Sequence, residues 1–489
     1  MDLKDKGDNM KKIFIKIISL LLSVTLLASI TGCNKDEVNM DGIKNYNNQQ
    51  DFVLGSWLSP DIGKKADDGT YPTAEKLWGW YAESGLNEMT IFPACNETEE
   101  YLQVALAMCK KYGIKAQILL RNSTSRFSKS WKELLEGYED IVTGFDIWDE
   151  PYGYKEETTG SDTYRPDIGD LMETGIPYVL NNFPGKSFTV TLWPNYANEN
   201  QLAMPEGKSY EDYVKLYAET VLSAVPQGTR RWIGTDFYAY YKTRFDGGLL
   251  SNLEVLQKYG MQYNADVYLY IQTICDTARW RAPNRQEMAL QYYVALCYGV
   301  KNLQMYCYQH PAGAQSGGIP AESTYSMLTD GYSIRYNEAT GEYYKNEYER
   351  TDMYYSVKAL NNELDVLAKA YMDFKWQGVL TARGSVNNKV DDFSKLLYTL
   401  SSYEGIKSYT ATENTIIGCF KDGDGNNGYM ITNYSNPIDL KASEVDIDFG
   451  DATRALVYAN GVQTAVNLKN GHYKATINGG DGHFVIPFI

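Results

Sequence analysis

The chain has 489 residues and a formal net charge of -16 at pH 7. Nucleic acid and anionic membrane surfaces both require a basic patch, so an acidic chain of this kind is expected to bind neither. An apolar fraction of 44% supports a large globular protein with substantial cores, enough for one large domain and a smaller one. The 42 tyrosines and 9 tryptophans suit sugar binding, although tyrosine-rich barrels also use such rings for packing.

The histidines and cysteines argue against several kinds of site. Three histidines, two of them near the C-terminus, make a Ser-His-Asp triad or a histidine-rich zinc site hard to build, so no metal is expected. Apart from Cys33, the cysteines lie far apart without CxxC spacing and are expected to be mostly free, buried thiols. The sequence has no glycine-rich phosphate loop, so no nucleotide and no other cofactor is expected.

The first 32 residues have the pattern of a secretory signal. Two lysines precede an uncharged run from Ile17 to Ile30, which is too short for a comfortable membrane span. The run ends in Ile30-Thr31-Gly32-Cys33, which resembles a bacterial lipobox, where the cysteine is lipidated and becomes the mature N-terminus. The alternative is an ordinary signal peptide with a chance cysteine. We expect a protein outside the cytoplasm, anchored to a bacterial membrane or cell surface by lipid at Cys33.

Residues 33–50 are polar and without periodicity, which predicts a flexible tether. From residue 51 to residue 373, short apolar runs alternate with segments of helical periodicity, several of which end in a glycine. The apolar runs predict eight strands, at residues 52–57, 86–92, 115–120, 141–147, 187–193, 231–237, 266–272 and 302–308.

The strand spacing averages about 35 residues per unit, which favours a (β/α)8 TIM barrel over residues 51–373. A doubly wound parallel sheet is the alternative, because a sequence does not reveal whether a sheet closes. Residues 374–489 alternate apolar and polar side chains with frequent turns, which predicts a small antiparallel β-sandwich. The segment Asp422 to Asn426 resembles the start of a calcium loop, but no glutamate stands at the closing position, so a hairpin turn is expected.

Carboxylates stand where two predicted strands end. Asp149 and Glu150 follow the apolar run 141–147, and Asp236 lies near the end of the sixth run. Acidic side chains are rarely buried without partners, so a pair at the mouth of a hydrophobic strand needs a reason. One reading is a turn or capping acid before Pro151. In a (β/α)8 barrel, however, the C-terminal ends of the strands form the site, which favours a chemical role.

These features together resemble the clan A glycoside hydrolases, and among them the family 42 β-galactosidases and the related lipoproteins of gut bacteria. The resemblance covers most of residues 51–489 in architecture. Its specific part is short and consists of Phe145-Asp146-Ile147-Trp148-Asp149-Glu150-Pro151, Thr235-Asp236-Phe237-Tyr238 and Asn302-Leu303-Gln304-Met305-Tyr306-Cys307-Tyr308. The resemblance implies that Glu150 is the general acid/base. The residue before it is usually asparagine, and here it is Asp149.

A second departure concerns the nucleophile. The resemblance implies a nucleophilic glutamate at the end of the seventh strand, where this sequence has Gln272. An amide cannot attack an anomeric carbon, so either the nucleophile lies elsewhere or the retaining mechanism does not operate. Asp236 and Asp276 are the candidate partners, and Asp236 is favoured because it ends a strand beside Tyr238. The separation of the two carboxyl groups decides between a retaining and an inverting reaction.

The sequence therefore predicts a glycoside hydrolase that acts on an extracellular oligosaccharide or polysaccharide. Glu150 would be the acid, with its pKa raised by the wall of Trp148 and the charge of Asp149, and Asp236 would be base or nucleophile. Asp149 would orient Glu150 or hold a hydroxyl group. The remaining strand ends would bind the sugar through Trp57, Arg121, Trp193, Tyr238, Gln272, Tyr306 and Tyr308. The alternative is a non-catalytic surface lipoprotein that binds glycans, which Gln272 favours.

Overall fold

The computed structural model describes residues 38–39, 41–91, 98–121, 123, 129–154, 165–276, 279–309, 325–329, 334–337, 342–345, 347–385 and 392–489. The predicted signal peptide and Cys33 lie outside these residues. None of the helices in the described ranges is long and apolar enough to cross a membrane.

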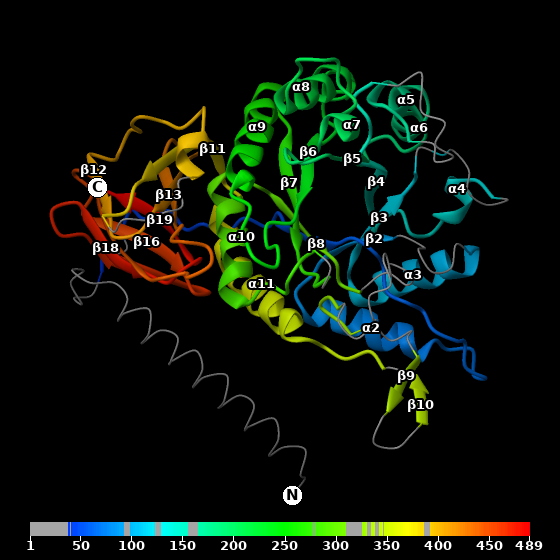
Figure 1. Ribbon diagram of the computed structural model, residues 1–489. Helices are drawn as coiled ribbons and strands as arrows, with labels where there is room; N and C mark the ends of the chain where they lie inside the picture. The colour runs from blue at the N-terminus through cyan, green and yellow to red at the C-terminus, as the bar shows by residue number, and fades with distance from the viewer. Residues whose placement is uncertain are drawn as a thin grey trace, which may run out of the picture.

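Eight parallel strands pair in chain order and close into a barrel (Figure 1). Closure is direct, because the first strand also pairs with the eighth, with Val53 opposite Asn302. The predicted (β/α)8 barrel is thus confirmed, and the doubly wound sheet is excluded. The strands are β1 (Val53–Ser56), β2 (Glu88–Ile91), β3 (Lys115–Leu119), β4 (Val142–Asp149), β5 (Ser187–Leu192), β6 (Trp232–Phe237), β7 (Asp266–Gln272) and β8 (Asn302–Tyr306).

The helices between the strands begin and end at residues suited to those positions. Asn284, for example, caps its helix by accepting a hydrogen bond from the backbone of Glu287, whose side chain bonds back to Asn284. Gly113 ends another helix with a φ of 70°, which a glycine adopts at little cost. The helices are α2 (Pro72–Glu83), α3 (Glu99–Tyr112), α4 (Trp131–Leu134), α5 (Ile168–Glu173), α6 (Gly175–Asn182), α7 (Glu199–Leu202), α8 (Tyr210–Thr220), α9 (Gly248–Tyr263), α10 (Arg285–Cys297) and α11 (Asp352–Tyr371).

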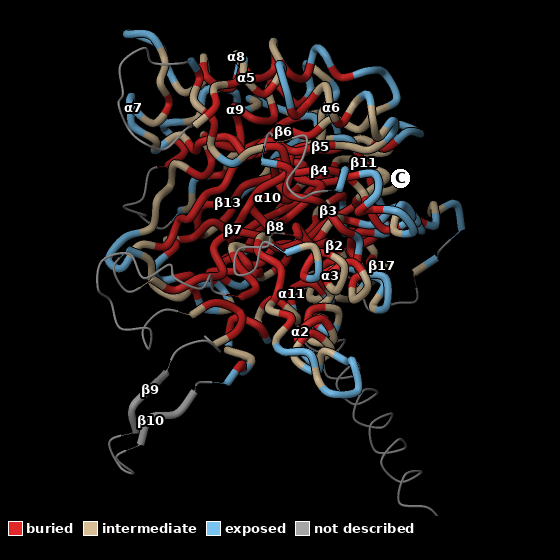
Figure 2. Tube along the Cα trace, turned by 90° about the vertical axis from the view of Figure 1, so that its right-hand side faces the viewer, coloured by how far each residue is buried: buried red, intermediate tan, exposed pale blue. Residues whose placement is uncertain are grey.

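The barrel interior is filled by large aromatic side chains. Trp232, Tyr268 and Tyr270 form a buried cluster of their own, separate from the core between strands and helices. A side chain at Gly234 would collide with Tyr268, whose nearest atoms lie 2.4 Å from the position of a Cβ atom. The glycine thus makes room for the ring beneath the end of β6. Figure 2 shows the barrel strands as a continuous buried region, with exposed residues on the outer turns.

Two antiparallel sheets follow the barrel and share one apolar core, which confirms the predicted sandwich. The larger sheet has the order β11 (Phe374–Ala382), β13 (Thr415–Asp422), β14 (Asn427–Asn433), β19 (Gly482–Phe488), β16 (Arg454–Ala459) and β17 (Val462–Asn467). The smaller sheet has the order β12 (Ser408–Ala411), β15 (Ser443–Asp448) and β18 (His472–Ile477). A separate hairpin of β9 (Ile334–Asn337) and β10 (Glu342–Lys345) extends from the barrel (Figure 1). Asp422 to Asn426 form the predicted hairpin turn between β13 and β14.

The two domains are joined through a common core and a buried ionic contact. Phe374, Phe420 and Phe484 of the sandwich belong to the same apolar cluster as the barrel helices. Arg285 of α10 pairs with Glu363 of α11 at 2.7 Å and with Asp481 of the sandwich at 3.3 Å. Removing one partner of such a contact would leave an uncompensated charge, so it fixes which surfaces meet.

The second half of the predicted tether is not free. Residues 39–51, here called the strap, run along the sandwich to the start of β1. Tyr46 is 3% exposed, stacks near Phe374 and donates a hydrogen bond to Asp422. Lys44 pairs with Asp424 at 2.6 Å. The composition of the strap resembles that of a disordered segment, but a single buried tyrosine and a few ion pairs attach it to the folded body.

Asp422 provides a test of this attachment. Burial by itself would raise the pKa of Asp422, but hydrogen bonds from Asn426, Lys44 and Tyr46 outweigh it and lower the pKa to about 2. An aspartate in an unfolded chain has a pKa of about 3.9, so the stabilisation is complete above that pH and is lost as the pH falls toward 2. We expect Asp422→Asn to reduce the free energy of unfolding by about 2 kcal/mol at pH 7 and about half as much at pH 3.

Urea denaturation of both proteins at the two pH values would measure this difference. Asp451→Asn is the matched control, because the side chain of Asp451 is 87% exposed and its pairing with Lys407 should contribute little. A loss for Asp422→Asn that is the same at pH 7 and pH 3 would contradict the assigned contacts.

Candidate active site

A cavity of about 200 Å³ opens at the C-terminal end of the barrel. Six of the residues selected from the sequence line it, and three others join them. The lining residues are Trp57, Asp149, Glu150, Thr191, Asp236, Tyr238, Tyr270, Trp280 and Tyr306. One cavity therefore contains three carboxyl groups from two strands and several aromatic rings from others.

Asp149 and Glu150 both reach this cavity although they are adjacent in the chain. Successive side chains of a strand point to opposite faces, so neighbours do not normally share a site. Glu150 has a φ of 54°, which is uncommon for a residue other than glycine and breaks the alternation. Its backbone N–H donates to Thr191 at 2.7 Å, which holds the turn against β5. Backbone strain of this kind is concentrated at functional sites.

Arg165 holds the turn from the other side. Its guanidinium donates to the carbonyl oxygen of Glu150 at 3.0 Å and lies 3.6 Å from the carboxylate of the same residue. The guanidinium also lies over the ring of Trp193, 4.8 Å from its centre, and near that of Tyr152. Arg165 is thus positioned by two aromatic rings and positions Glu150 in turn.

Asp236 approaches the cavity from β6. It is 7% exposed, and its Oδ1 atom is buried without a hydrogen-bond partner among the described residues. A buried acceptor left unpaired costs free energy, so this atom is placed to receive a donor from a ligand. Asp236 is followed two residues later by Tyr238, which also lines the cavity.

Another carboxyl group lies deeper in the barrel. Asp146 of β4 is 1% exposed, and neither of its carboxylate oxygens has a hydrogen-bond partner among the described residues. Burial raises the pKa of Asp146 well above its usual value, and the charge of Asp149 raises it further. Asp146 is therefore neutral near pH 7 and adds no negative charge beneath the cavity.

The three carboxyl groups of the cavity have different proton affinities. Burial raises the pKa of Asp149 to about 6, against the opposing charges of Arg165 and Arg121. Burial and then the charge of Asp149 raise the pKa of Asp236 further, to about 8. Burial, followed by the charges of Asp236 and Asp149, raises the pKa of Glu150 above both. Asp149 is thus the first of the three to ionise, and it does so near neutral pH.

Aromatic rings form the wall opposite the acids. The ring of Tyr306 lies 5.6 Å from that of Trp57 and 4.9 Å from that of Tyr238, centre to centre. Trp280 continues the row at 5.0 Å from Tyr238. Its indole N–H is buried without a partner among the described residues. Such a wall can stack against the apolar face of a sugar ring while the acids bind its hydroxyl groups.

Several predicted binding residues lie outside the cavity lining. Tyr308 is fully buried and donates to the carbonyl oxygen of Leu77, as a core residue. The amide of Gln272 bonds to backbone atoms of Tyr240, Ile274 and Arg281 and so organises the loops after β6 and β7. The other residues are outside for different reasons: Trp148 and Trp193 pack against the main core, Arg121 is exposed and acts on the acids through its charge, and Asp276 lies in the loop after β7.

Sequence reasoning missed Tyr270, Trp280 and Arg165. Tyr270 lies two residues before Gln272, so strand alternation could have identified it as an interior residue. Trp280 is in the loop after β7, beyond the residues selected there. Arg165 lies 15 residues after Glu150, and no local pattern indicates that the chain returns to the site.

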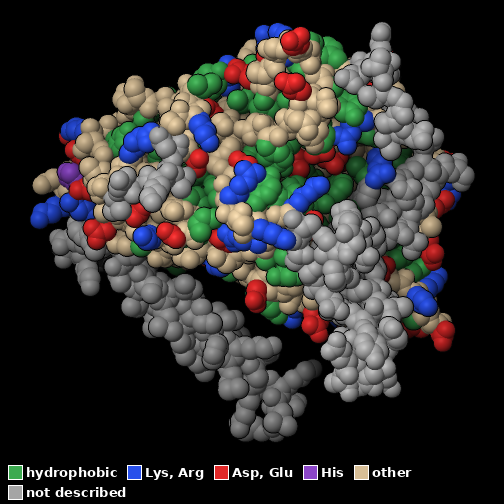
Figure 3. Space-filling model, viewed as in Figure 1, with side chains coloured by type: hydrophobic (Ala, Val, Ile, Leu, Met, Phe, Trp, Pro, Cys, Tyr) green, Lys and Arg blue, Asp and Glu red, His purple; other side chains and the backbone are tan. Residues whose placement is uncertain are grey.

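The described residues contain no group of three or more His, Cys, Asp or Glu side chains arranged to hold a metal ion. On the face shown in Figure 3, basic side chains are interspersed with acidic and apolar ones. No protein family model and no curated protein matches the chain.

Solved structures that align with the chain include a β-L-arabinopyranosidase of family GH27 from Geobacillus stearothermophilus, at 9% identity, with 89% of this chain and 96% of that chain covered and a TM-score of 0.44. A maltogenic α-amylase from Thermotoga neapolitana aligns at 10% identity, over 89% and 98% of the chains, with a TM-score of 0.38. A β-galactosidase from Halorubrum lacusprofundi aligns at 11% identity, over 64% and 58%, with a TM-score of 0.37. At such scores the function has to be argued from the site itself.

The strained turn predicts an unusual response to mutation. A left-handed backbone costs about 1 kcal/mol for a residue with a Cβ atom and much less for glycine. We therefore expect Glu150→Gly to be more stable than Glu150→Ala by about 1 kcal/mol, although both remove the same carboxylate. Thermal unfolding of the two variants would show this order.

Glu136 provides the matched control. It is an exposed glutamate with a φ outside the left-handed region, so Glu136→Gly should be the less stable of its pair. The same order at both positions would contradict a left-handed Glu150.

Proposed function

We propose that the protein is a glycoside hydrolase that removes single sugar residues from the ends of extracellular oligosaccharides or polysaccharides. The observation that carries this proposal is the pairing of Asp149 with Asp236 in one cavity, facing an aromatic wall. The two carboxyl groups come from strands that are not neighbours, and their pKa values are separated so that one is ionised while the other is protonated. An acid and a carboxylate on different sides of a sugar are what glycoside hydrolysis requires.

Asp236 is the proton donor in this proposal. Its proton passes to the glycosidic oxygen as the bond from that oxygen to the anomeric carbon breaks, so the leaving sugar departs as a neutral alcohol. Asp149 is the carboxylate that stabilises the positive charge on the sugar ring. The separation of the two groups in the substrate complex decides whether Asp149 bonds to the anomeric carbon or activates a water molecule.

This assignment changes the roles inferred from the sequence. Glu150 was expected to be the acid, but its carboxyl group is already in contact with Arg165. Asp236 has a free acceptor atom toward the cavity and is protonated near neutral pH. Glu150 then serves as a neutral acid that binds a sugar hydroxyl beside Asp149.

The cavity volume supports a substrate of one sugar residue. Liquid water occupies about 30 Å³ per molecule, so 200 Å³ corresponds to about seven waters and roughly to one six-membered sugar ring. Its floor is closed by Tyr270, a buried residue of β7. A closed pit accommodates the end of a glycan chain better than its middle.

The alternative function, glycan binding without hydrolysis, rested on Gln272. The side chain of Gln272 bonds to the backbone of neighbouring loops, so its amide does not stand in for a carboxylate facing the cavity. That placement favours the hydrolase. We further propose that the protein works outside the cytoplasm, attached to a membrane by lipid at Cys33, as the lipobox-like sequence suggests.

Variants of the three acids test the proposal. We expect Asp149→Asn and Asp236→Asn each to lower kcat/KM on oligosaccharides by about 10³, as is typical for the loss of acid or base catalysis. Glu150→Gln should lower it by about tenfold, mainly through KM. Release of reducing ends from a panel of β-linked oligosaccharides, measured beside binding isotherms, provides both quantities. Asp276→Asn is the control and should keep wild-type activity.

Aryl glycosides with acidic phenols identify the donor, because such leaving groups depart without a proton. Asp236→Asn should recover most of its activity on these substrates, whereas Asp149→Asn should not. Recovery by Glu150→Gln instead would exchange the roles of Glu150 and Asp236. Saturable binding by the wild type without new reducing ends on any substrate would establish the glycan-binding alternative.

The pH dependence of kcat/KM provides a further test. Activity requires Asp149 ionised and Asp236 protonated, so the profile should be bell-shaped with limbs near pH 6 and pH 8. The Tyr238 hydroxyl bonds to Asp236 and lowers its pKa, so Tyr238→Phe should move the alkaline limb to higher pH. Tyr308→Phe, on the core side of the barrel wall, is the matched control. An unchanged alkaline limb in Tyr238→Phe would contradict the assignment of Asp236.

A further inference from the structure

The strap is attached to the body at three separate places. Arg454, at the start of β16, donates to the carbonyl oxygens of Asn39 and Asp41 at 2.8 and 3.0 Å. Lys44 and Tyr46 bind the turn at Asp422, as described above. Farther along, the backbone N–H of Asn48 donates to Lys369 of α11 at 2.9 Å. Thirteen residues are therefore fixed along the sandwich and the adjoining helix.

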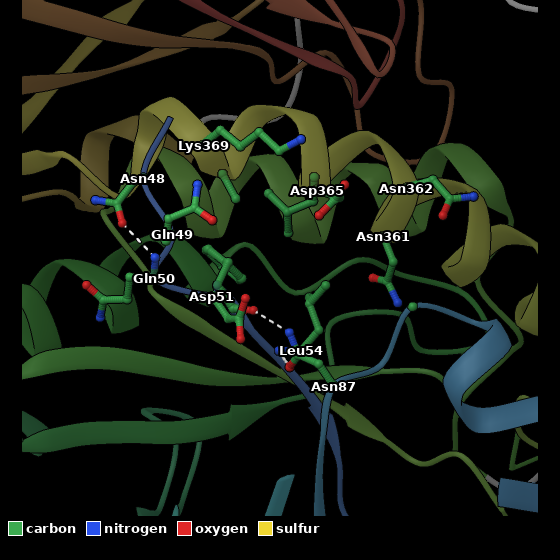
Figure 4. Close-up of a pocket in the computed structure, with 14 residues that line it drawn as sticks. Asn48, Gln49, Gln50, Asp51, Leu54, Asn87, Asn361, Asn362, Asp365 and Lys369 are labelled. Carbon is green, nitrogen blue, oxygen red and sulfur yellow. Dashed lines mark hydrogen bonds between the residues drawn. The ribbon is translucent and has the colours of Figure 1, made fainter. Parts of the chain in front are cut away.

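The strap ends at opposite features of the molecule. Its first residue lies at the end of the sandwich, where Arg454 also binds the carbonyl oxygen of the C-terminal residue, Ile489. Its last residues enter β1 at the N-terminal end of that strand. Figure 4 shows this second end, where Asn48, Gln49, Gln50 and Asp51 face α11 across a cavity of about 530 Å³. All eight barrel strands are parallel, so the strap lies at the end of the barrel opposite Glu150 and Asp236.

The length of chain before the strap limits how far the body can move from an anchor. Six residue steps separate Cys33 from Asn39, and a fully extended chain spans at most about 3.6 Å per residue, or about 22 Å in all. A folded body of some 450 residues has a radius of gyration of about 22 Å and so a diameter well above that reach. With the strap free, 18 residues would separate the anchor from the barrel and the body could turn over.

We infer that the strap fixes the orientation of the protein on a lipid bilayer. The sandwich end that carries Asn39, Arg454, Asp451 and Ile489 lies against the bilayer, and the cavity with Asp149 and Asp236 opens away from it. This orientation rests on the lipid anchor at Cys33 proposed above. It exposes the cavity to glycan chains that arrive from the surrounding medium and turns it away from the headgroups of the membrane that holds the protein.

Energy transfer from labelled protein to labelled lipid measures the orientation. The full-length lipidated protein, carrying Cys95→Ser, is inserted into the outer leaflet of phosphatidylcholine vesicles that contain a headgroup-linked acceptor dye. The five cysteines in the described ranges are buried and do not compete for label. One sample carries the donor dye at Asp451→Cys, on the sandwich end, and the other at Lys242→Cys, in the exposed loop after β6.

We expect at least twofold greater quenching of the donor at Asp451→Cys than at Lys242→Cys. The matched control inserts 20 Gly and Ser residues between Asn34 and Lys35, which lengthens the connection without changing the folded body, and the ratio should fall toward one. Equal or reversed quenching in the parent protein would overturn the inferred orientation and leave the anchor standing. Cys33→Ala tests the anchor separately: if it binds vesicles as well as the parent, or if the parent does not bind, the anchor and the orientation both fail.

Discussion

The burial of three carboxyl groups in one small cavity is the constraint on which the site depends. Like charges at such a distance in a poorly solvated cavity cannot all be ionised, so the cluster divides into one carboxylate and two neutral acids. Asp149 takes the charge because Arg165 and Arg121 offset it, whereas Asp236 and Glu150 both experience its field. The proton distribution that hydrolysis needs thus follows from the shape of the cavity before any substrate is bound.

The scaffold arranges these groups by departing from regular strand geometry at the right place. A left-handed Glu150 lets two neighbours share the cavity, and it is held by Thr191 on one side and Arg165 on the other. Arg165 is itself fixed by the rings of Trp193 and Tyr152. Trp193, selected from the sequence as a sugar platform, therefore acts at one remove, by positioning the arginine that positions the acid.

The same body has two functional ends. The cavity lies at the C-terminal ends of the strands, while the strap and the sandwich occupy the other end and its side. Lys44 and Tyr46 bind Asp422 at the turn that resembles a calcium loop. The ammonium group of Lys44 there neutralises acids that could otherwise attract an external cation, and it does so by recruiting a segment that precedes the barrel.

The sequence by itself determined the eight strands, the following sandwich and the acids at the strand ends, because alternation, helical periodicity and glycine stops are local signals that burial enforces. It also indicated Asp149, Glu150 and Asp236 together. Barrel closure, the direction of each side chain and the proton distribution were decided by tertiary structure alone. A one-residue change of direction separates Tyr306, at the cavity, from Tyr308, in the core. Arg165, Trp280 and the docked strap depend on contacts between distant parts of the chain, which no local pattern encodes.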